Sequence, residues 1–284
     1  MLMPQEQFAD QNEIIGVIAG SEGLPYVLID QLQQKCINFI IIALDLKLHF
    51  YLKYKGLPSF YCSLTRVSPI LQILNKFQIS KILLIGKVLR PNLASLLGID
   101  DEAKKILKYL KDFRGGDNNL LTNLITYLEQ HLNLNVLDPN PYLQFLTVNS
   151  GILTSNDISD QLTSDIQLGQ DYLKFASKYD IGQAVVIRNN QIIAVEALEG
   201  TEKMLKRCQE FKQLKPAGVL VKQPKTNQET KVDIPTIGIN TLKQIKNAGI
   251  AAVAITAGKT YLVDKSQMLT YAKNNNIAIV AINE

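Results

Sequence analysis

The sequence predicts an α/β protein of two domains, the first built on a Rossmann-like parallel sheet and the second a smaller mixed α/β domain. Short, continuous apolar runs alternate with segments of helical periodicity, and such runs are typical of parallel strands covered on both faces. The chain has 284 residues, more than one average domain, and Pro139 and Pro141 interrupt its centre. We therefore expect a tail at 1–13, a first domain at 14–140 and a second at 147–284.

The first domain opens with a strand, a tight turn and a helix. Residues 14–19 are apolar and residues 24–35 show helical periodicity. The turn between them contains Ala19, Gly20, Ser21 and Gly23. Its glycines do not have the G-x-G-x-x-G spacing, yet glycines at this place let backbone amides approach an anion at a helix N-terminus. A nucleotide-binding turn and a purely structural turn both remain open.

Asp45 follows the second apolar run, which covers residues 37–44. It stands about twenty residues beyond the turn, where Rossmann folds place the acidic residue that holds a ribose hydroxyl. A GKVLR segment ends at Arg90 and follows another apolar strand at the ligand edge of the sheet. The remaining segments of this domain are a strand at 81–85 and helices at 68–77, 101–113 and 118–131.

The second domain repeats the alternation of helices and strands, with one hairpin. Asn189 and Asn190 tolerate positive φ and are expected to turn strand 184–187 back onto strand 192–197. Thr201 is expected to cap a helix at 202–214. The other predicted helices are 165–178, 241–248 and one from Ser266, and the other strands are 219–221, 251–256, 260–263 and 277–282, with a turn at Gly258.

Residues 218–238 read GVLVKQPKTNQETKVDIPTIG and carry Lys222, Lys225, Lys231 and Asp233. Lysines that face a common gap can neutralise phosphate oxygens, and a carboxylate there can hold Mg²⁺ or polarise a water. A solvated loop is the simpler reading of a single lysine-rich segment. Glu196 and Glu199, which follow the hairpin, could share a cation.

Composition excludes several classes of protein. Hydrophobic residues make up 46% and charged residues 20% of the chain, which is typical of a globular protein, and no run is long enough for a membrane span. The net charge of +4 comes without basic and aromatic runs, so nucleic acid is not an expected partner, while contact with an anionic membrane surface is permitted. The tail lacks the features of a signal peptide. Three scattered cysteines indicate reduced thiols, and His49 and His131 are expected to be structural.

The chain resembles the UDP-2,3-diacylglucosamine pyrophosphatase family of lipid A biosynthesis, of the type unrelated to calcineurin-like phosphoesterases. The matching motifs are IIGVIAGSEGLP, GKVLRP, DIGQAVVIRNNQIIAVEALEGTEKML, GVLVK and DIPTIG, in the family's order from about Ile14 to Ile282. The resemblance implies a two-domain α/β enzyme that uses Mg²⁺ to hydrolyse the pyrophosphate, giving UMP and 2,3-diacylglucosamine 1-phosphate, with water attacking the phosphorus on the sugar side.

The resemblance also implies roles for individual residues. It makes Asp233 the essential aspartate and places Lys222 and Lys225 on the family's lysine positions. We further expect Asp233 to hold Mg²⁺ or to orient the attacking water, Lys222, Lys225 and Lys231 to act as catalytic cations, and Glu196 and Glu199 to be additional metal or water contacts. Lys231 stands where the family has arginine, so a two-pronged phosphate contact becomes a point charge. The positions expected to bind the substrate or cofactor are Ala19, Gly20, Ser21, Gly23, Asp45, Gln183, Thr201, Gln228 and Thr236.

A lipid substrate implies a cytoplasmic protein in peripheral contact with the inner membrane, and a homodimer is left open. Two other functions remain to be separated by experiment. A dinucleotide-dependent oxidoreductase is suggested by the first turn and Asp45, and would bind NAD(P)H tightly. A non-catalytic nucleotide-binding or lipid-binding module would release no UMP.

Overall fold

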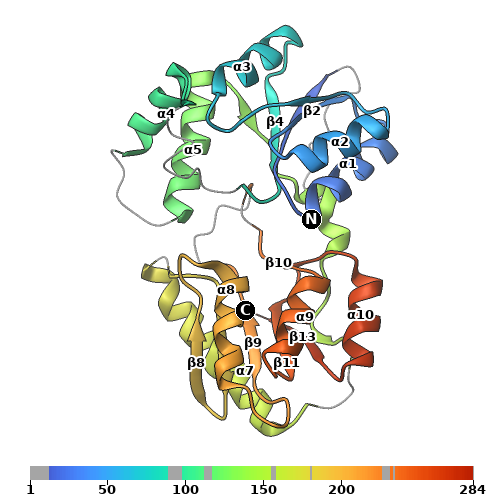
Figure 1. The fold of residues 1–284 in the computed structure, drawn as a ribbon, viewed down its shortest axis with the longest axis vertical. Coiled ribbons are helices and arrows are strands. Elements are labelled where there is room, and N and C mark those ends of the chain that lie inside the picture. Colours follow the sequence, from blue (N-terminus) through green and yellow to red (C-terminus); the bar gives the residue numbers. More distant parts are fainter. Residues whose placement is uncertain are drawn as a thin grey trace, which may run out of the picture. The chain divides into compact units, whose positions relative to one another are not determined.

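The computed structural model describes residues 13–88, 98–111, 117–154, 158–179, 181–225, 231–232 and 234–283. The chain forms two compact units, each with its own sheet (Figure 1). The first unit runs to Leu143 and also includes Lys231 and Val232, and the second begins at Gln144. The predicted fold class is confirmed, because both units are α/β, with a parallel first sheet and a mixed second sheet.

The first unit contains five strands and six helices among its described residues. The strands are β1 (Ile15–Ala19), β2 (Phe39–Ala43), β3 (Ser59–Tyr61), β4 (Lys81–Ile85) and β5 (Asn135–Val136). The helices are α1 (Leu24–Gln34), α2 (Leu46–Tyr54), α3 (Val67–Lys76), α4 (Asp101–Lys111), α5 (Asp117–Leu132) and α6 (Asn140–Leu143). The strand order is β3-β2-β1-β4-β5, and every pair is parallel. This is the Rossmann order, whose direction reverses between β1 and β4.

The apolar runs form the centre of this sheet for the expected reason. β1 lies between β2 and β4, with Val17 paired to Ile41 and to Leu83, and all three side chains are fully buried. A strand that is covered on both faces needs apolar residues at successive positions rather than at alternate ones. The strands predicted at 14–19, 37–44 and 81–85 are therefore confirmed.

The second unit has a six-stranded mixed sheet and a separate two-stranded pair. The strands are β6 (Gly151–Ile152), β7 (Ala184–Arg188), β8 (Gln191–Val195), β9 (Val219–Lys222), β10 (Thr236–Ile237), β11 (Ala252–Thr256), β12 (Tyr261–Leu262) and β13 (Ala278–Ile282). The helices are α7 (Asp160–Ala176), α8 (Gly200–Cys208), α9 (Ile239–Asn247) and α10 (Lys265–Asn274). The large sheet has the order β6-β13-β11-β9-β7-β8, and β10 pairs with β12 in parallel.

The predicted hairpin joins β7 to β8. Asn189 and Asn190 have φ values of 52° and 58°, in the left-handed region that asparagine tolerates. Asp165, which is almost fully buried on α7, accepts the amides of both turn residues at 3.1 and 2.7 Å. The helix therefore holds the turn as well as covering the sheet, because unpaired amides buried at this place would be costly.

Two described residues of the lysine-rich segment group with the first unit. Lys231 Nζ donates to Glu129 Oε1 at 2.9 Å, and Val232 packs against the core around α3 and α5. A segment that follows a strand of the second unit thus contributes to the first. Sequence patterns did not predict that Lys231 and Val232 pack with the first unit, because this packing depends on elements that are distant in sequence.

No described helix combines the length and the apolar character that crossing a bilayer requires. Cys36, Cys62 and Cys208 are free thiols, and Cys36 alone is exposed. His131 packs against the rings of Tyr109 and Tyr127, with centroids 5.2 and 4.9 Å away.

Candidate functional site

One edge of the large sheet of the second unit gathers polar residues from several elements. β9 ends there at Lys222, and its antiparallel neighbour β7 begins there, with Ala184 paired to Lys222. The hairpin returns β8 to the same edge, so Glu196 follows that strand beside Gln183. Lys222, Gln183 and Glu196, which lie far apart in the sequence, therefore meet at one edge. Strand ends and the loops beside them are the usual place for ligands on α/β sheets.

Glu196 is the centre of a hydrogen-bonded group at this edge. Its side chain is buried, with 7% exposure, and both of its carboxylate oxygens are used. Oε2 accepts a hydrogen bond from the backbone amide of Gln183 at 3.2 Å, and Oε1 accepts one from the Thr201 hydroxyl at 2.9 Å. A buried carboxylate needs such donors, because desolvation is otherwise very costly. Three of the residues expected at the site are thus brought together.

The prediction that Thr201 caps a helix is wrong. α8 begins at Gly200, one residue earlier, and Glu199 at its N-cap makes no side-chain capping bond. Thr201 lies inside the first turn, where its hydroxyl donates to Glu196. The helix also ends at Cys208 rather than at Leu214, and one 3-10 turn follows it. The threonine therefore links α8 to the end of β8.

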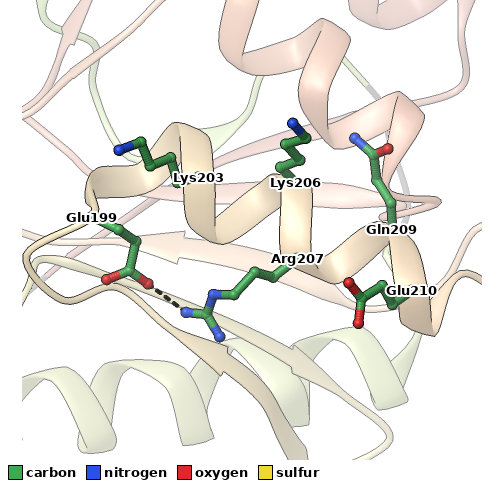
Figure 2. A pocket seen from close by; sticks show the side chains of 6 residues that line it. All are labelled: Glu199, Lys203, Lys206, Arg207, Gln209 and Glu210. Atoms are coloured by element: carbon green, nitrogen blue, oxygen red, sulfur yellow. Dashed lines mark hydrogen bonds and ion pairs between the residues drawn. The ribbon is translucent and has the colours of Figure 1, made fainter.

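Glu199 is engaged elsewhere, so the structure does not support a cation shared with Glu196. Arg207 Nη2, about two turns further along α8, donates to Glu199 Oε1 at 2.5 Å (Figure 2). Its own backbone amide and the Arg207 guanidinium hold the pKa of the Glu199 carboxyl below its ordinary value. Figure 2 shows both residues on the open surface of α8, with Lys203 and Lys206 projecting from the other side of the helix. The side chains of Glu199, Arg207, Lys203 and Lys206 therefore do not converge on one point.

Lys222 is a buried ammonium at the end of β9. It is 8% exposed, and Nζ donates to the carbonyl oxygen of Thr236 at 3.0 Å. This contact ties β9 to β10, just beyond the lysine-rich segment. Thr236 therefore contributes its carbonyl oxygen to Lys222, while its hydroxyl donates to the carbonyl of Ile234 at 3.0 Å.

The structure adds two buried polar residues at this edge that sequence reasoning missed. Gln223 follows Lys222, and Thr256 ends the neighbouring strand β11, where Ile255 pairs with Lys222. Gln223 Oε1 and Thr256 Oγ1 are buried without a hydrogen-bond partner among the residues that the structure describes. Buried polar atoms of this kind are often completed by a ligand or water. A polar residue at or directly after the end of an apolar strand was the available signal, and it was not applied to Gln223 or Thr256.

The other residues expected from the lysine-rich segment are only partly described. Asp233 and Gln228 lie outside the described residues, so their predicted roles stay predictions. Lys225 is partly buried beyond the end of β9. Lys231 groups with the first unit, where it pairs with Glu129. The expected gathering of three lysines and Asp233 around one gap therefore also stays a prediction.

In the first unit, the expected nucleotide turn lies at the point where the strand order reverses. The loops after β1 and β4 meet there, and Ser21 and Lys87 exchange backbone hydrogen bonds of 2.8 and 3.0 Å. The Gly20 amide donates to the Ile85 carbonyl at 2.8 Å. The Gly20 and Ser21 amides thus each donate to a backbone carbonyl, and nucleotide binding at this turn stays a prediction.

Close approach explains the glycine at position 20. A Cβ atom there would lie 2.4 Å from the Lys87 carbonyl oxygen, so any side chain would push the two loops apart. Ala19 is buried at the end of β1, and Gly23 occupies the N-cap of α1. Asp45 caps α2, with Oδ1 accepting the Leu48 amide at 2.8 Å. A structural role thus accounts for Asp45 in the described state.

The described carboxylates do not fit a metal cage of their own. Within the described ranges, no three His, Cys, Asp or Glu side chains gather as metal ligands. Glu196 and Glu199 use their oxygens in the contacts given above. The predicted use of Mg²⁺ stays a prediction, and so does the role of Asp233, which lies outside the described residues.

Comparison with known proteins covers both units. The model of the LpxI N-terminal domain matches residues 14–146, and that of the LpxI C-terminal domain matches residues 149–280. The UDP-2,3-diacylglucosamine pyrophosphatase LpxI of Caulobacter vibrioides is 26% identical over 278 residues, which span 94% of this chain and 97% of that protein. The two domain models follow one another along nearly the whole sequence, and the chain belongs to the LpxI family.

Proposed function

We propose that this chain hydrolyses the pyrophosphate bond of UDP-2,3-diacylglucosamine to UMP and 2,3-diacylglucosamine 1-phosphate. The observation that carries the proposal is the match of both LpxI domain models, in order, to a chain whose relative is named for this substrate. The buried Lys222 at a strand end of the second unit supports it. Hydrolysis of a phosphoric anhydride depends mainly on positioning and charge neutralisation, which suits lysines and a carboxylate.

Lys222 is the described residue best suited to bind the pyrophosphate. Its ammonium is shielded from water, so its attraction to a phosphate oxygen is screened less than that of an exposed lysine. The Thr236 carbonyl occupies one of its three donor positions and fixes the direction of the side chain. Lys225 follows as a second cation, and Lys231 as a third if its segment approaches the substrate.

In the proposed reaction, a water oxygen bonds to the phosphorus on the sugar side while the bond from that phosphorus to the bridging oxygen breaks. The bridging oxygen leaves with UMP, and the water gives up a proton. We propose that Asp233 orients this water or holds Mg²⁺, which would supply charge neutralisation on the phosphates. Glu196 acts as a positioning residue, because it holds Gln183 and Thr201 at the edge beside Lys222.

The nucleotide end of the substrate is proposed to bind the first unit at the point where its strand order reverses, between β1 and β4. The turn residues Ala19 to Gly23 would shape this nucleotide-binding turn of the first unit, and Asp45 is proposed to reach a ribose hydroxyl at the sheet edge where it caps α2. Because the Gly20 and Ser21 amides are engaged, contacts from other groups, or an opening of the two loops, would be needed.

The substrate carries acyl chains, so we propose that the protein works on the cytoplasmic face of the inner membrane in peripheral contact with it. A homodimer is compatible with peripheral contact with the membrane.

The decisive assay follows UMP release from UDP-2,3-diacylglucosamine in detergent micelles. We expect wild-type turnover that stops on chelation and returns with Mg²⁺, and a loss of at least about a hundredfold in Asp233→Ala and Lys222→Met. In ¹⁸O-labelled water, the label should appear in the sugar phosphate and not in UMP. Asp233→Ala with wild-type turnover would overturn the proposed role of that residue. Absence of UMP release together with tight NAD(P)H binding would replace the hydrolase with an oxidoreductase.

A further inference from the structure

The outer face of α2 in the first unit is unusual for a surface helix. Its sequence is LKLHFYLKY, and Leu48, His49 and Leu52 are buried against the unit. Phe50 is 65% and Tyr54 88% exposed on the opposite side. A surface helix normally turns polar side chains to water, whereas a helix that is apolar on all sides is normally covered all round. The outer-face residues, here called the α2 face, are Leu46, Lys47, Phe50, Tyr51, Lys53 and Tyr54.

The α2 face is continuous because of its helical spacing. Leu46, Phe50 and Tyr54 recur at every fourth position, which places them in one row along the helix. Tyr51 lies beside this row, and its ring packs edge-on against Tyr26 of α1, with centroids 4.9 Å apart. The edge strand β3 adds Tyr61, whose ring is also exposed. Exposed aromatic side chains gathered in this way indicate an interaction surface rather than scattered surface residues.

The charge on the α2 face has one sign. Residues 46–61 contain Lys47, Lys53 and Lys55 and no Asp or Glu. The carboxylate nearest in sequence, Asp45, accepts the Leu48 amide at the start of the helix. α4 shows the contrast, because its surface alternates acids and lysines joined in ion pairs such as Lys104 with Asp101. A face of lysines and aromatic rings without acids complements an anionic surface.

We propose that the α2 face docks on an anionic lipid bilayer. Phenylalanine and leucine would enter the boundary of the acyl region, tyrosine rings would lie at the level of the headgroups, and lysine side chains would extend to lipid phosphates. This proposal rests on the proposed function in one respect, since a substrate with two acyl chains requires a membrane-bound source. A second copy of the chain fits less well, because a symmetric contact through this face would bring lysines against lysines.

Docking through α2 would also bring the ligand edge of the first sheet close to the bilayer. α2 starts directly after β2, so Leu46 lies at the same sheet edge as the turn after β1, where the Leu44 amide donates to the Ala19 carbonyl at 2.8 Å. A headgroup bound at that edge could therefore remain near the membrane that holds its acyl chains.

The test is co-sedimentation of the full-length chain with phosphatidylcholine vesicles, with and without phosphatidylglycerol. We expect binding that requires the anionic lipid. Phe50→Ser with Tyr54→Ser should weaken it by about tenfold or more. Replacing Lys47, Lys53 and Lys55 by Gln should weaken it by about a hundredfold, since each lysine near such a surface contributes roughly fivefold. All these side chains are exposed, so thermal melting should change little.

The matched control is a second aromatic pair with the same spacing. Phe175 lies in the last turn of α7 and Tyr179 in the 3-10 turn that follows it. They are 58% and 66% exposed and are flanked by Lys174 and Lys178. Phe175→Ser with Tyr179→Ser should leave vesicle binding unchanged. Equal binding by the α2 variants and wild type, or a larger loss in the control, would overturn the proposal. So would a wild type that ignores anionic vesicles, or α2 variants that only change the oligomeric mass.

Turnover separates this proposal from the proposed function. With substrate in detergent micelles, the α2 variants should match wild type, whereas with substrate in anionic vesicles they should be at least about tenfold slower. A wild type without turnover that still binds anionic vesicles through α2 would overturn the function and leave the docking surface standing. Slower turnover of the α2 variants in both media would count against docking and indicate a role of α2 in substrate binding.

Discussion

At the scale of single residues, the site in the second unit depends on how Glu196 is held. The carboxylate is buried and accepts two hydrogen bonds, one from the Gln183 amide and one from the Thr201 hydroxyl. Gly182 explains why Gln183 can approach so closely, because a Cβ atom at position 182 would lie 2.3 Å from the Glu196 carbonyl oxygen. Gly182 and Gln183, which precede β7, are therefore fitted closely to the residue that follows β8.

Thr201→Val tests this arrangement with little change in shape. The variant loses the hydroxyl and leaves one buried carboxylate oxygen short of a donor, so we expect the free energy of unfolding to fall by about 1 to 3 kcal/mol. If Glu196 positions the edge beside Lys222, kcat should fall by roughly tenfold, with KM changed less. Chemical denaturation and the UMP assay measure the two effects. Thr201→Ser keeps the hydroxyl and should restore both, and a fully active Thr201→Val would show that the contact has no part in turnover.

Sequence reasoning found single residues best where the local backbone decides the role. Asn189 and Asn190 were predicted to turn a hairpin because few residues accept positive φ, and the structure confirms it. Thr201 was assigned to a cap because a helix start is a common place for threonine, but its partner is a carboxylate five positions earlier. Which acceptor a hydroxyl finds depends on how β8 and α8 pack, and no local pattern encodes that.

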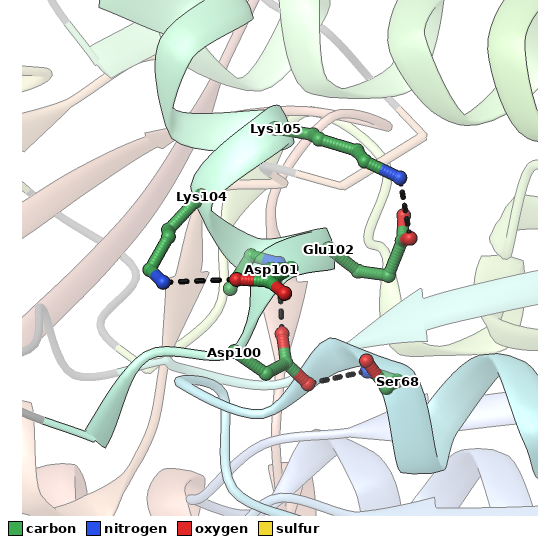
Figure 3. Close-up of polar contacts among 7 residues, drawn as sticks. Ser68, Asp100, Asp101, Glu102, Lys104 and Lys105 are labelled. Carbon is green, nitrogen blue, oxygen red and sulfur yellow. Dashed lines mark hydrogen bonds and ion pairs between the residues drawn. The ribbon is translucent and has the colours of Figure 1, made fainter.

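At the scale of elements, Asp100 shows how one carboxylate joins two helices. Its Oδ1 accepts the Ala103 amide of α4 at 2.9 Å, and its Oδ2 accepts the Ser68 amide of α3 at 2.7 Å (Figure 3). Burial by itself opposes ionisation, but the amide hydrogen bonds outweigh it and lower the pKa of Asp100 below its ordinary value of 3.8. The charged carboxylate therefore stabilises the folded state.

The pH dependence of this contribution can be measured with Asp100→Asn. Because the pKa is lower in the folded chain, the stabilisation is present above about pH 4 and is lost as the pH falls through the folded-state pKa. We expect the variant to be less stable by about 1 to 2 kcal/mol at neutral pH, with the difference shrinking in acid. Asp101→Asn is the control, since this exposed neighbour pairs only with Lys104 in the contacts that Figure 3 shows. If both variants lost the same amount of stability at every pH, the proposed stabilisation of α3 and α4 by the ionised Asp100 carboxylate would be contradicted.

Elements with a clear period were predictable, and short or ambiguous ones were not. The longer parallel strands and most helices appear within a few residues of their expected bounds, because apolar runs and helical spacing are local signals, whereas the short parallel strands β3 and β5 were not predicted. α2 was missed since its apolar residues lie on both sides and give no one-sided stripe. β6 and β10 have two residues each and pair with segments distant in sequence, whereas the equally short β12 falls within the strand predicted at 260–263.

At the scale of the whole molecule, the two units are connected by more than one passage of the chain. Lys231 and Val232 come after β9 of the second unit and pack with the first. The sequence assigned residues 147–284 to a single domain, because composition does not change within the lysine-rich segment. Contacts such as that of Lys231 with Glu129, 102 positions apart, become visible only in three dimensions.

Lys231 therefore has two candidate roles, one in the ion pair with Glu129 and one as a catalytic cation. The pair with Glu129 is partly exposed, with side chains 34% and 35% accessible, so its loss should cost no more than about 1 kcal/mol of stability. A lysine that binds the pyrophosphate would have a much larger effect on the reaction, since an ammonium near transferring phosphates stabilises the transition state. Stability and turnover therefore separate the two roles.

Glu129→Gln and Lys231→Met form the matched comparison. Both remove the ion pair, but only Lys231→Met removes the cation. We expect the two variants to melt at nearly the same temperature, and we expect turnover to fall by about tenfold or more in Lys231→Met while Glu129→Gln stays near wild type. Lys231→Arg should be at least as active as wild type, because a guanidinium can make a two-pronged phosphate contact. Equal turnover in Lys231→Met and Glu129→Gln would make Lys231 a structural residue of the first unit, and the proposed catalytic cations would then be Lys222 and Lys225.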